Sequence, residues 1–204
     1  MMQLYFATTS TFVRKVMVCA RLLNLSDDIE LLDSAAHPVD RDERIASFNP
    51  LAKVPALRTA EGLCLYDSRV ICEYLNSLAQ GTLIPHSGEA RWISLTRQAL
   101  GDGLADAALL AHYEFNARPP EKQWQGWADA QLKKVNAALA ESERQATGFS
   151  RQPDDIGLIS IGCALGYLDF RFAQFHWREN HPQLAAWFAV FDTHPAMVES
   201  RPHV

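Results

Sequence analysis

The stretch that decides the fold runs from Asn49 to Ser68 and reads Asn-Pro-Leu-Ala-Lys-Val-Pro-Ala-Leu-Arg-Thr-Ala-Glu-Gly-Leu-Cys-Leu-Tyr-Asp-Ser. A turn at Asn49-Pro50 leads to Val54-Pro55. Two short apolar runs follow, and a Glu61-Gly62 turn separates them. A helical pattern begins at Asp67-Ser68. The stretch therefore predicts a loop, two strands joined by a tight turn, and a helix.

The same stretch carries groups that suit a small ligand with both charges. Lys53 supplies a cation at the loop end, and Val54 supplies a backbone that is open for pairing. Asp67 and Ser68 bring a carboxylate and a hydroxyl to the start of the helix. Together these groups favour a zwitterionic peptide as the ligand.

Composition excludes several classes of protein. The 204 residues are 48% hydrophobic and 21% charged, which is typical of a globular protein. A net charge of −5 argues against a general nucleic-acid binder, because neutralising phosphates needs clustered Lys and Arg. No apolar run approaches the ~20 residues that span a bilayer, so we expect no membrane association. The sequence Met-Met-Gln-Leu-Tyr-Phe at the N-terminus lacks the basic region and long apolar run of a signal peptide.

The cysteines and histidines predict neither disulfides nor a metal site. The four cysteines form no Cys-x-x-Cys pair and lie in apolar patterns, which favours free thiols in a reducing compartment and a cytoplasmic protein. The seven histidines contain no His-x-x-x-His pair of the kind that binds metal on a helix.

The chain opens with a strand and a helix. Leu4 and Phe6 alternate with polar or aromatic neighbours, which predicts a strand of period two. Apolar residues then recur at helical spacing from Phe12 onward. Either Ser10 or Thr11 is suited to cap this helix.

The first 79 residues then fit one domain. Residues 29–32 form a second predicted strand, and a β-α-β opening favours parallel pairing through a right-handed crossover. Residues 34–48 are polar and mixed, so we expect a loop with one short helical turn. The Asn49–Ser68 stretch adds two strands and a helix. We therefore predict an α/β thioredoxin-like domain over residues 1–79, built as β-α-β followed by β-β-α.

The second half reads as helix throughout. Glycines and a proline mark a linker over residues 80–88, and an all-α domain is predicted over residues 89–204 with about five helices. In its first helix, we expect the apolar face that packs against the core to consist of Ile93, Leu100, Leu104, Ala107, Ala108 and Ala111. In the next helix, we expect the corresponding apolar face to consist of Trp124, Trp127, Ala128, Leu132, Val135 and Leu139. Residues 156–172 are apolar on most sides, which predicts a central buried helix.

Two motifs at this separation, in front of a helical domain, resemble the soluble glutathione S-transferase family. They are Asn-Pro-Leu-Ala-Lys-Val-Pro-Ala-Leu at 49–57 and Asp-Ser-Arg-Val-Ile-Cys-Glu-Tyr-Leu at 67–75. The opening Thr-Ser-Thr-Phe-Val-Arg-Lys-Val at 9–16 is similar to that of serine-type members. Together with Gly-Tyr-Leu-Asp-Phe at 166–170, it is most similar to a small bacterial YibF-like branch.

The chain departs from the family pattern at two helix starts. Thr11 replaces the usual Pro, which pre-sets the first helical turn. In the family, a Ser or Thr three residues before an Asp often caps the central helix of the second domain. Here Asp155 is present but Gln152 stands at the hydroxyl position, and Gln is a poor cap. This leaves Asp154 as an alternative cap.

The resemblance implies a site for glutathione. A cis Val54-Pro55 bond would present the Val54 backbone to the cysteinyl part of glutathione. Ser68 and the helix start would bind the γ-glutamyl carboxylate, and Asp67 its ammonium. Lys53 would reach the glycyl carboxylate. The alternatives are that Asp67 and Ser68 only begin a helix, and that Lys53 is a solvated loop residue.

The resemblance makes Ser10 the expected catalytic residue. Its hydroxyl would donate a hydrogen bond to the glutathione sulfur and so favour the thiolate. Thr8, Thr9 and Thr11 also carry hydroxyls, so the alternative is that Ser10 only caps the helix. Arg14, one turn later, either adds positive field at the sulfur or is solvated.

The family's activity would be conjugation of glutathione to an electrophilic small molecule in detoxification. The resemblance places the acceptor pocket near Phe12, His112 and Tyr113; the alternative is that His112 and Tyr113 are ordinary core or surface residues. It also implies a homodimer, in which Asp102 or Asp106 reaches glutathione in the neighbouring subunit. Two alternatives remain: a non-catalytic glutathione-binding stress adaptor and a glutathione-dependent peroxidase. The acceptor itself is not encoded in any local motif.

Overall fold

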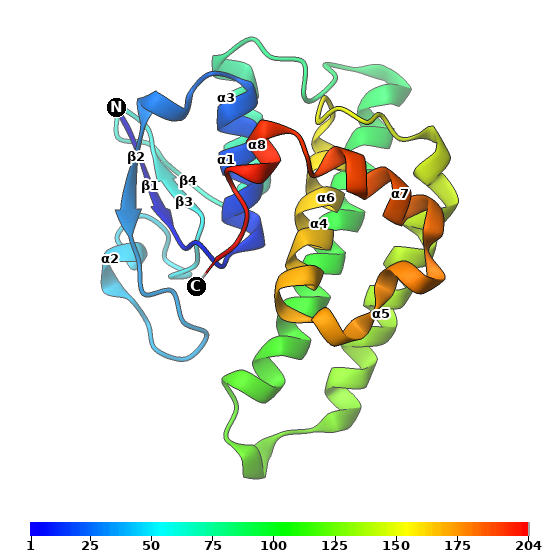
Figure 1. The fold of residues 1–204 in the computed structure, drawn as a ribbon. Coiled ribbons are helices and arrows are strands. Elements are labelled where there is room, and N and C mark those ends of the chain that lie inside the picture. Colours follow the sequence, from blue (N-terminus) through cyan, green and yellow to red (C-terminus); the bar gives the residue numbers. More distant parts are fainter. Residues whose placement is uncertain (204) are drawn as a thin grey trace. The chain divides into compact units, whose positions relative to one another are not determined.

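The computed structural model describes residues 1–203 and divides into two compact units, whose elements Figure 1 labels. Unit 1 contains Met1–Ile84 together with residues 199–203, and unit 2 contains Pro85–Val198. The division falls inside the linker predicted over residues 80–88. The last residues join unit 1 rather than the helical unit to which the sequence assigned them. There the Arg21 Nε donates a hydrogen bond to the Glu199 carboxylate at 3.0 Å.

Unit 1 has the predicted thioredoxin-like order of elements. They are β1 (Met2–Phe6), α1 (Thr11–Leu22), η1 (Ser26–Asp28), β2 (Ile29–Asp33), α2 (Glu43–Ala46), β3 (Ala56–Arg58), β4 (Cys64–Leu65) and α3 (Ser68–Leu78). The sheet order is β2-β1-β3-β4. β1 and β2 are parallel, whereas β3 is antiparallel to both β1 and β4. The prediction of this fold is confirmed.

The sheet is stable because its side chains alternate between two covered faces. Leu4 and Leu57 are opposite each other in the β1–β3 pair and are fully buried. Helices α1 and α3 pack together on one side of the sheet (Figure 1). On the other side, Ile45 of α2 and Phe48 form a small core with Ala56.

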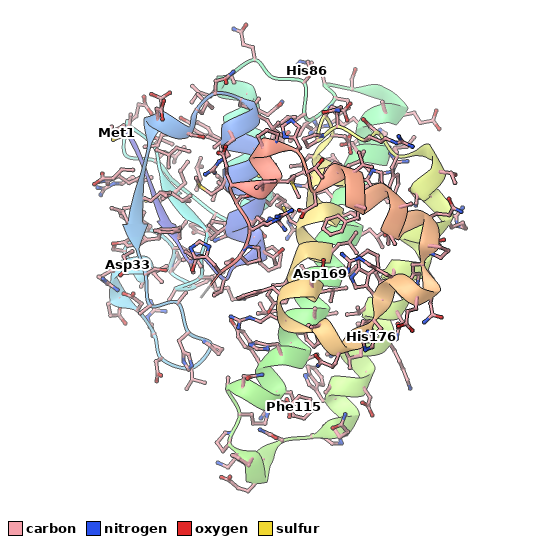
Figure 2. The ribbon with its side chains drawn as sticks, viewed as in Figure 1. Met1, Asp33, His86, Phe115, Asp169 and His176 are labelled. Carbon is pink, nitrogen blue, oxygen red and sulfur yellow. The ribbon has the colours of Figure 1, made fainter. Side chains whose placement is uncertain are left out.

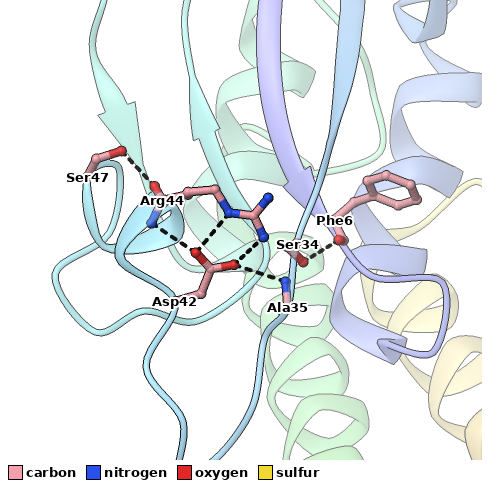
Figure 3. Close-up of polar contacts among 6 residues, drawn as sticks. All are labelled: Phe6, Ser34, Ala35, Asp42, Arg44 and Ser47. Atoms are coloured by element: carbon pink, nitrogen blue, oxygen red, sulfur yellow. Dashed lines mark hydrogen bonds and ion pairs between the residues drawn. The ribbon is translucent and has the colours of Figure 1, made fainter.

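The loop after β2 is held by one carboxylate (Figure 3). Asp42 caps α2, accepts a hydrogen bond from the Ala35 N–H at 3.0 Å, and pairs with the Arg44 guanidinium at 2.8 Å. The Arg44 side chain and then the Ala35 N–H hold the pKa of Asp42 well below its usual range. Ser34 ties the same loop to the end of β1, because its hydroxyl donates to the Phe6 carbonyl.

Unit 2 is helical, as predicted. Its α-helices are α4 (Gly88–Asn116), α5 (Gln125–Gln145), α6 (Ile156–Arg171), α7 (Pro182–Phe191) and α8 (Pro195–Val198), joined in part by 3-10 turns. Within residues 1–203, no single helix is long and apolar enough to cross a membrane. One pair bent by 101° at a break, Ile156–Arg171 and Ala173–Asn180, meets that test when taken together.

Helices α4 and α6 approach each other closely through glycines. A Cβ on Gly101 of α4 would lie 2.6 Å from the Ile161 backbone N, and a Cβ on Gly157 of α6 would lie 2.6 Å from the Ser94 carbonyl. Such contacts are closer than real Cβ atoms allow, so only glycine permits this packing.

Two predicted helix stripes were partly wrong. Ile93 is 44% exposed, whereas Ser94 is 1% exposed, because this turn of α4 lies against α6 at Gly157. The expected positions Leu104, Ala107, Ala108 and Ala111 are buried. Trp124 and Trp127 are 67% and 41% exposed. Trp124 is the N-cap that precedes α5 and is not part of the helix. The helical spacing of apolar residues therefore does not determine which way its side chain faces.

The cap of α6 also differs from the sequence prediction. Asp155 is the N-cap, and its Oδ1 accepts hydrogen bonds from the Gly157 N–H at 2.9 Å and the Leu158 N–H at 3.1 Å. Asp154 instead accepts a hydrogen bond from the Ser150 hydroxyl. The helix begins at Ile156, so residue 155, not 152 or 154, has the geometry of a cap.

We predict that Asp155→Ala lowers the free energy of unfolding by about 1 kcal/mol, because two helix N–H groups lose their acceptor. Asp154→Ala is the matched control, since it removes a neighbouring carboxylate that does not cap the helix; we expect a change of about 0.5 kcal/mol or less. Urea titration of both variants measures the difference. A larger loss in Asp154→Ala would contradict the cap assignment.

Candidate functional site

The site residues of unit 1 come together at one edge of its sheet. The end of β1, the start of β3 and the end of β4 lie at the same edge, because β3 runs antiparallel to both neighbours. The chain reaches Ser10 shortly after β1, Val54 shortly before β3, and Asp67 shortly after β4. Residues that are far apart in sequence thus share one edge, where α1 and α3 begin.

The side chain of Asn49 shapes the loop before β3. It is 3% exposed, and its amide Nδ2 donates to the Lys53 carbonyl at 2.9 Å. Its Oδ1 accepts from the Leu51 N–H at 3.0 Å. Between them, Ala52 has a left-handed φ of 52°. The sequence prediction treated Asn49 only as part of a turn and missed this role.

The loop ends with an open backbone at Val54. The Val54-Pro55 bond is cis, as the resemblance implied. The Val54 side chain packs against the core of Ile45, Phe48 and Ala56. Within residues 1–203, neither the N–H nor the C=O of Val54 has a backbone partner. Both groups are available to pair with an extended peptide, while Lys53 is exposed.

The start of α3 combines a carboxylate and a buried hydroxyl residue. Asp67 is the N-cap and follows a cis Tyr66-Asp67 bond. Its carboxylate accepts from the Arg69 N–H at 2.9 Å and pairs with the Arg69 guanidinium at 2.8 Å. Burial alone would raise the pKa of Asp67, but the Arg69 hydrogen bonds and the field of Lys15 outweigh it and lower the pKa. Ser68 is 2% exposed.

The start of α1 places Ser10 as the N-cap, rather than Thr11. The Ser10 Oγ accepts a hydrogen bond from the Val13 N–H at 3.3 Å, which leaves the hydroxyl hydrogen free to point elsewhere. The side chain therefore lies at the positive end of a 12-residue helix. Arg14 is 3% exposed, so it is not a solvated residue.

The candidate residues of unit 2 lie on α4. His112 is half-buried, and its ring centroid is 6.2 Å from Tyr113 and 6.4 Å from Phe172. Burial and then the charge of Arg171 lower the pKa of His112, so its imidazole is neutral at pH 7. Asp102 is 9% exposed, whereas Asp106 is exposed. Within residues 1–203, no group of His, Cys, Asp and Glu side chains is arranged to hold a metal ion.

Comparison with known proteins gives the family. The profile "Glutathione S-transferase, N-terminal domain" matches residues 9–78. The uncharacterized GST-like protein YibF of Escherichia coli K12 is 34% identical over 186 residues, which cover 90% of each chain. Elongation factor 1-gamma of Danio rerio is 25% identical over 148 residues, covering 72% of this chain and 33% of that protein.

A glutathione transferase family member from Pseudomonas fluorescens Pf-5 extends the likeness over the whole chain. Its structure with bound glutathione has a TM-score of 0.93 at 43% identity, with 100% of each chain covered. A second structure, with bound S-(propanoic acid)-glutathione, has a TM-score of 0.89 at 42% identity over the same coverage. The protein described here belongs to the glutathione S-transferase family.

We predict that Asn49→Ala lowers the free energy of unfolding by about 1–3 kcal/mol, because it leaves the Leu51 N–H and the Lys53 carbonyl without their buried partner. Ser47→Ala, at an exposed position nearby, should change it by about 0.5 kcal/mol or less. Urea unfolding checks the first statement. Hydrogen exchange should also show a faster-exchanging Leu51 amide, and an unchanged rate would count against the role of Asn49.

We also predict that His112 titrates below the ordinary histidine pKa of 6.5 in a proton NMR titration. Because the folded pKa is lowered, the unfolded chain binds this proton more readily, and stability falls as the pH drops from 6.5 toward the folded pKa. Arg171→Gln should raise the His112 pKa only part of the way, since burial is the larger cause. Arg144→Gln is the control and should leave it unchanged.

Proposed function

We propose that this protein is a glutathione transferase, an enzyme that activates the thiol of glutathione and conjugates it to an electrophilic small molecule. The observation that carries the proposal is the glutathione-bound structure from Pseudomonas fluorescens Pf-5, which is similar along the whole chain. We further propose a cytoplasmic homodimer in which Asp102 or Asp106 reaches glutathione in the neighbouring subunit.

Glutathione fits the groups at the edge of the unit 1 sheet. The free N–H and C=O of Val54 would pair with the cysteinyl backbone, with Pro55 fixing the entry to β3. Ser68 and the N–H groups at the start of α3 would bind the γ-glutamyl carboxylate. Asp67 would attract the ammonium, although it shares its charge with Arg69. The exposed Lys53 would pair with the glycyl carboxylate.

Ser10 is the group we assign to the sulfur. Its oxygen accepts from the Val13 N–H, so its own hydrogen can be donated to a thiolate. A free thiol has a pKa near ~8.5, and both this hydrogen bond and the positive end of α1 favour the anion. Each unit by which the thiol pKa falls is worth ~1.4 kcal/mol. A fall of about two units would make most of the bound thiol reactive at neutral pH.

The reaction then needs no further protein group at the sulfur. The thiol proton leaves to solvent, and the sulfur lone pair forms a C–S bond with the acceptor. In a substitution, the bond to the leaving group breaks; in an addition, the resulting carbanion takes a proton from water. Because a serine cannot form a disulfide, an enzyme–glutathione mixed disulfide is not part of this route. Phe12, His112 and Tyr113 are proposed to contact the acceptor.

The decisive variants separate catalysis by Ser10 from its role as a cap. Ser10→Ala should lower turnover of an electrophile such as 1-chloro-2,4-dinitrobenzene by roughly 10- to 100-fold, the value of one hydrogen bond to a charged group. Ser10→Gly keeps most of the cap strength and should lose as much turnover. Thr9→Ala is the matched control and should retain activity. Glutathione affinity, from calorimetry, should stay nearly constant in all three.

One alternative function has an observation in its favour. The match to part of elongation factor 1-gamma indicates that this fold also occurs within a translation factor, so the domain could serve as a non-catalytic glutathione-binding adaptor. Retention on glutathione resin without turnover of any electrophile in a panel would favour the adaptor. Turnover of a hydroperoxide, but of no other electrophile, would favour a glutathione-dependent peroxidase. Unchanged turnover in Ser10→Ala would reject Ser10 as the activating group.

A further inference from the structure

The chain turns back after α6 and reaches α7 through residues 172–181, which we call the connecting segment. It contains two 3-10 turns, η4 (Ala173–Phe175) and η5 (Trp177–Asn180), and the chain bends by 101° where it leaves α6. Between the turns, His176 has a left-handed φ of 45°, which is uncommon for a residue other than glycine. Such a backbone persists only where the surrounding structure holds it, so the connecting segment needs firm contacts with the rest of unit 2.

Asp169 of α6 supplies such contacts. It belongs to the Gly-Tyr-Leu-Asp-Phe motif at 166–170, and Figure 2 labels it together with His176 of the connecting segment. The Asp169 Oδ1 accepts hydrogen bonds from the Trp177 indole Nε1 at 2.9 Å and from the Arg178 Nη1 at 2.6 Å. Its Oδ2 accepts from the Arg178 Nη2 at 2.7 Å. A forked pair of this kind restricts orientation as well as distance, so one carboxylate fixes two consecutive residues.

The end of the connecting segment next to α7 is also packed into unit 2. Trp177 is 3% exposed, and its ring centroid lies 6.1 Å from that of Phe188 in α7. The Arg178 guanidinium lies 4.4 Å from the centroid of the Trp177 ring. The Nδ1 of His181, the residue before α7, donates a hydrogen bond to the Trp177 carbonyl at 2.6 Å. Packing and Asp169 therefore fix this end together.

The other end of the connecting segment carries Phe172. Its N–H still donates to the Leu168 carbonyl at 2.8 Å, but its φ of −131° is far from the helical value of about −63°. Because φ sets the direction of the Cα–Cβ bond, the ring points where it would not point if α6 continued. The Phe172 ring lies edge-to-face with His112, with centroids 6.4 Å apart. The path of the chain after α6 thus brings Phe172 against His112.

His112 is held at a ring nitrogen as well. The Asn116 Nδ2 lies 3.1 Å from the His112 Nδ1 and donates to the His112 carbonyl at 2.9 Å. Because an amide nitrogen can only donate, Nδ1 is the acceptor, and the neutral imidazole carries its hydrogen on Nε2. Tyr113 and Arg171 are the other ionisable groups close to His112. Asn116 and Phe172 together give the imidazole one orientation, with Nε2 as its donor.

A contribution to stability alone explains less of this arrangement. The side chains of Asp169 and Arg178 are 35% and 49% exposed, and ion pairs at such exposure contribute little to stability because water screens them. Glu141 makes a similar forked pair with Arg144, but both residues belong to α5, so that pair holds no other segment. The hydrogen bonds of Asp169 instead join a helix to the segment that follows it, and they fix the path of the chain.

We propose that Asp169 is a positioning residue for the acceptor. Its hydrogen bonds to Trp177 and Arg178 fix the path of the connecting segment. That path keeps the Phe172 ring against His112 and so maintains the orientation of the imidazole. The inference rests on the proposed function, in which His112 contacts the acceptor. Asp169 acts through Phe172 and is not itself assigned to the acceptor.

The first test uses His112 as a reporter in the full chain. Asp169→Ala removes all three hydrogen bonds, whereas Asp169→Asn keeps one acceptor oxygen and loses the charge-assisted fork. In Asp169→Ala, the nuclear Overhauser effect between the His112 and Phe172 rings should weaken. The pKa of His112 should rise toward 6.5, because burial is the larger cause of its lowering. Asp169→Asn should change both quantities in the same direction but by less.

Glu141→Ala is the matched control. It removes a carboxylate whose side chain is 37% exposed and which also forms a forked pair with an arginine. Neither the His112 pKa nor the Overhauser effect should change in this variant. An unchanged His112 in Asp169→Ala would overturn the inference. If that variant does not fold, Asp169→Asn decides the same question by the same criterion.

The second test measures the consequence for the acceptor. In Asp169→Ala, the KM for 1-chloro-2,4-dinitrobenzene should rise by roughly two- to tenfold, the value of one aromatic contact, while affinity for glutathione stays constant. Glu141→Ala should retain the KM of the wild type. A changed His112 with an unchanged KM would overturn the positioning role and leave the proposed function standing. A wild type that turns over no electrophile would overturn the proposed function and, with it, the role of Asp169 toward the acceptor.

Discussion

The buried amide of Asn49 makes two hydrogen bonds on which the rest of unit 1 depends. By binding the Leu51 N–H and the Lys53 carbonyl, it closes a loop in which Ala52 is left-handed. The closed loop delivers Val54 to the edge of the sheet with its N–H and C=O unpaired. β3 can then pair antiparallel with β1, and the starts of α1 and α3 lie at the same edge as the open backbone.

Unit 2 depends on a different constraint, the close backbone packing of α4 and α6. Gly101 and Gly157 allow this contact, and the polar side chains of Ser94 and Gln98 are buried in the first half of α4. The same packing brings the end of α6 beside the last turns of α4. Arg171, in the last turn of α6, thereby lies near His112 and Tyr113 of α4.

The two units supply different parts of the proposed chemistry. Unit 1 has the open strand edge and two helix N-termini, which suit a small peptide with a thiol. Unit 2 brings the rings of His112, Tyr113 and Phe172 close to one another, and His112 and Tyr113 are proposed to contact the acceptor. Membership of the glutathione S-transferase family fixes the first ligand class more firmly than the second, because the motifs at 49–57 and 67–75 are local and specific. An acceptor site is assembled from side chains of separate helices.

Local sequence determined the elements, the thioredoxin-like order of unit 1, the cis Val54-Pro55 bond expected from the family, and the candidate residues Ser10, Asp67 and Ser68. These features follow from the spacing of apolar residues, from turn residues and from contiguous motifs, all of which depend on a few neighbouring residues. Only the tertiary structure decided which helix positions are buried, that residue 155 caps α6, and that Arg171 contacts aromatic side chains. Burial and charge pairing depend on what lies across from a side chain, and that partner comes from a distant part of the chain whose position no local pattern specifies.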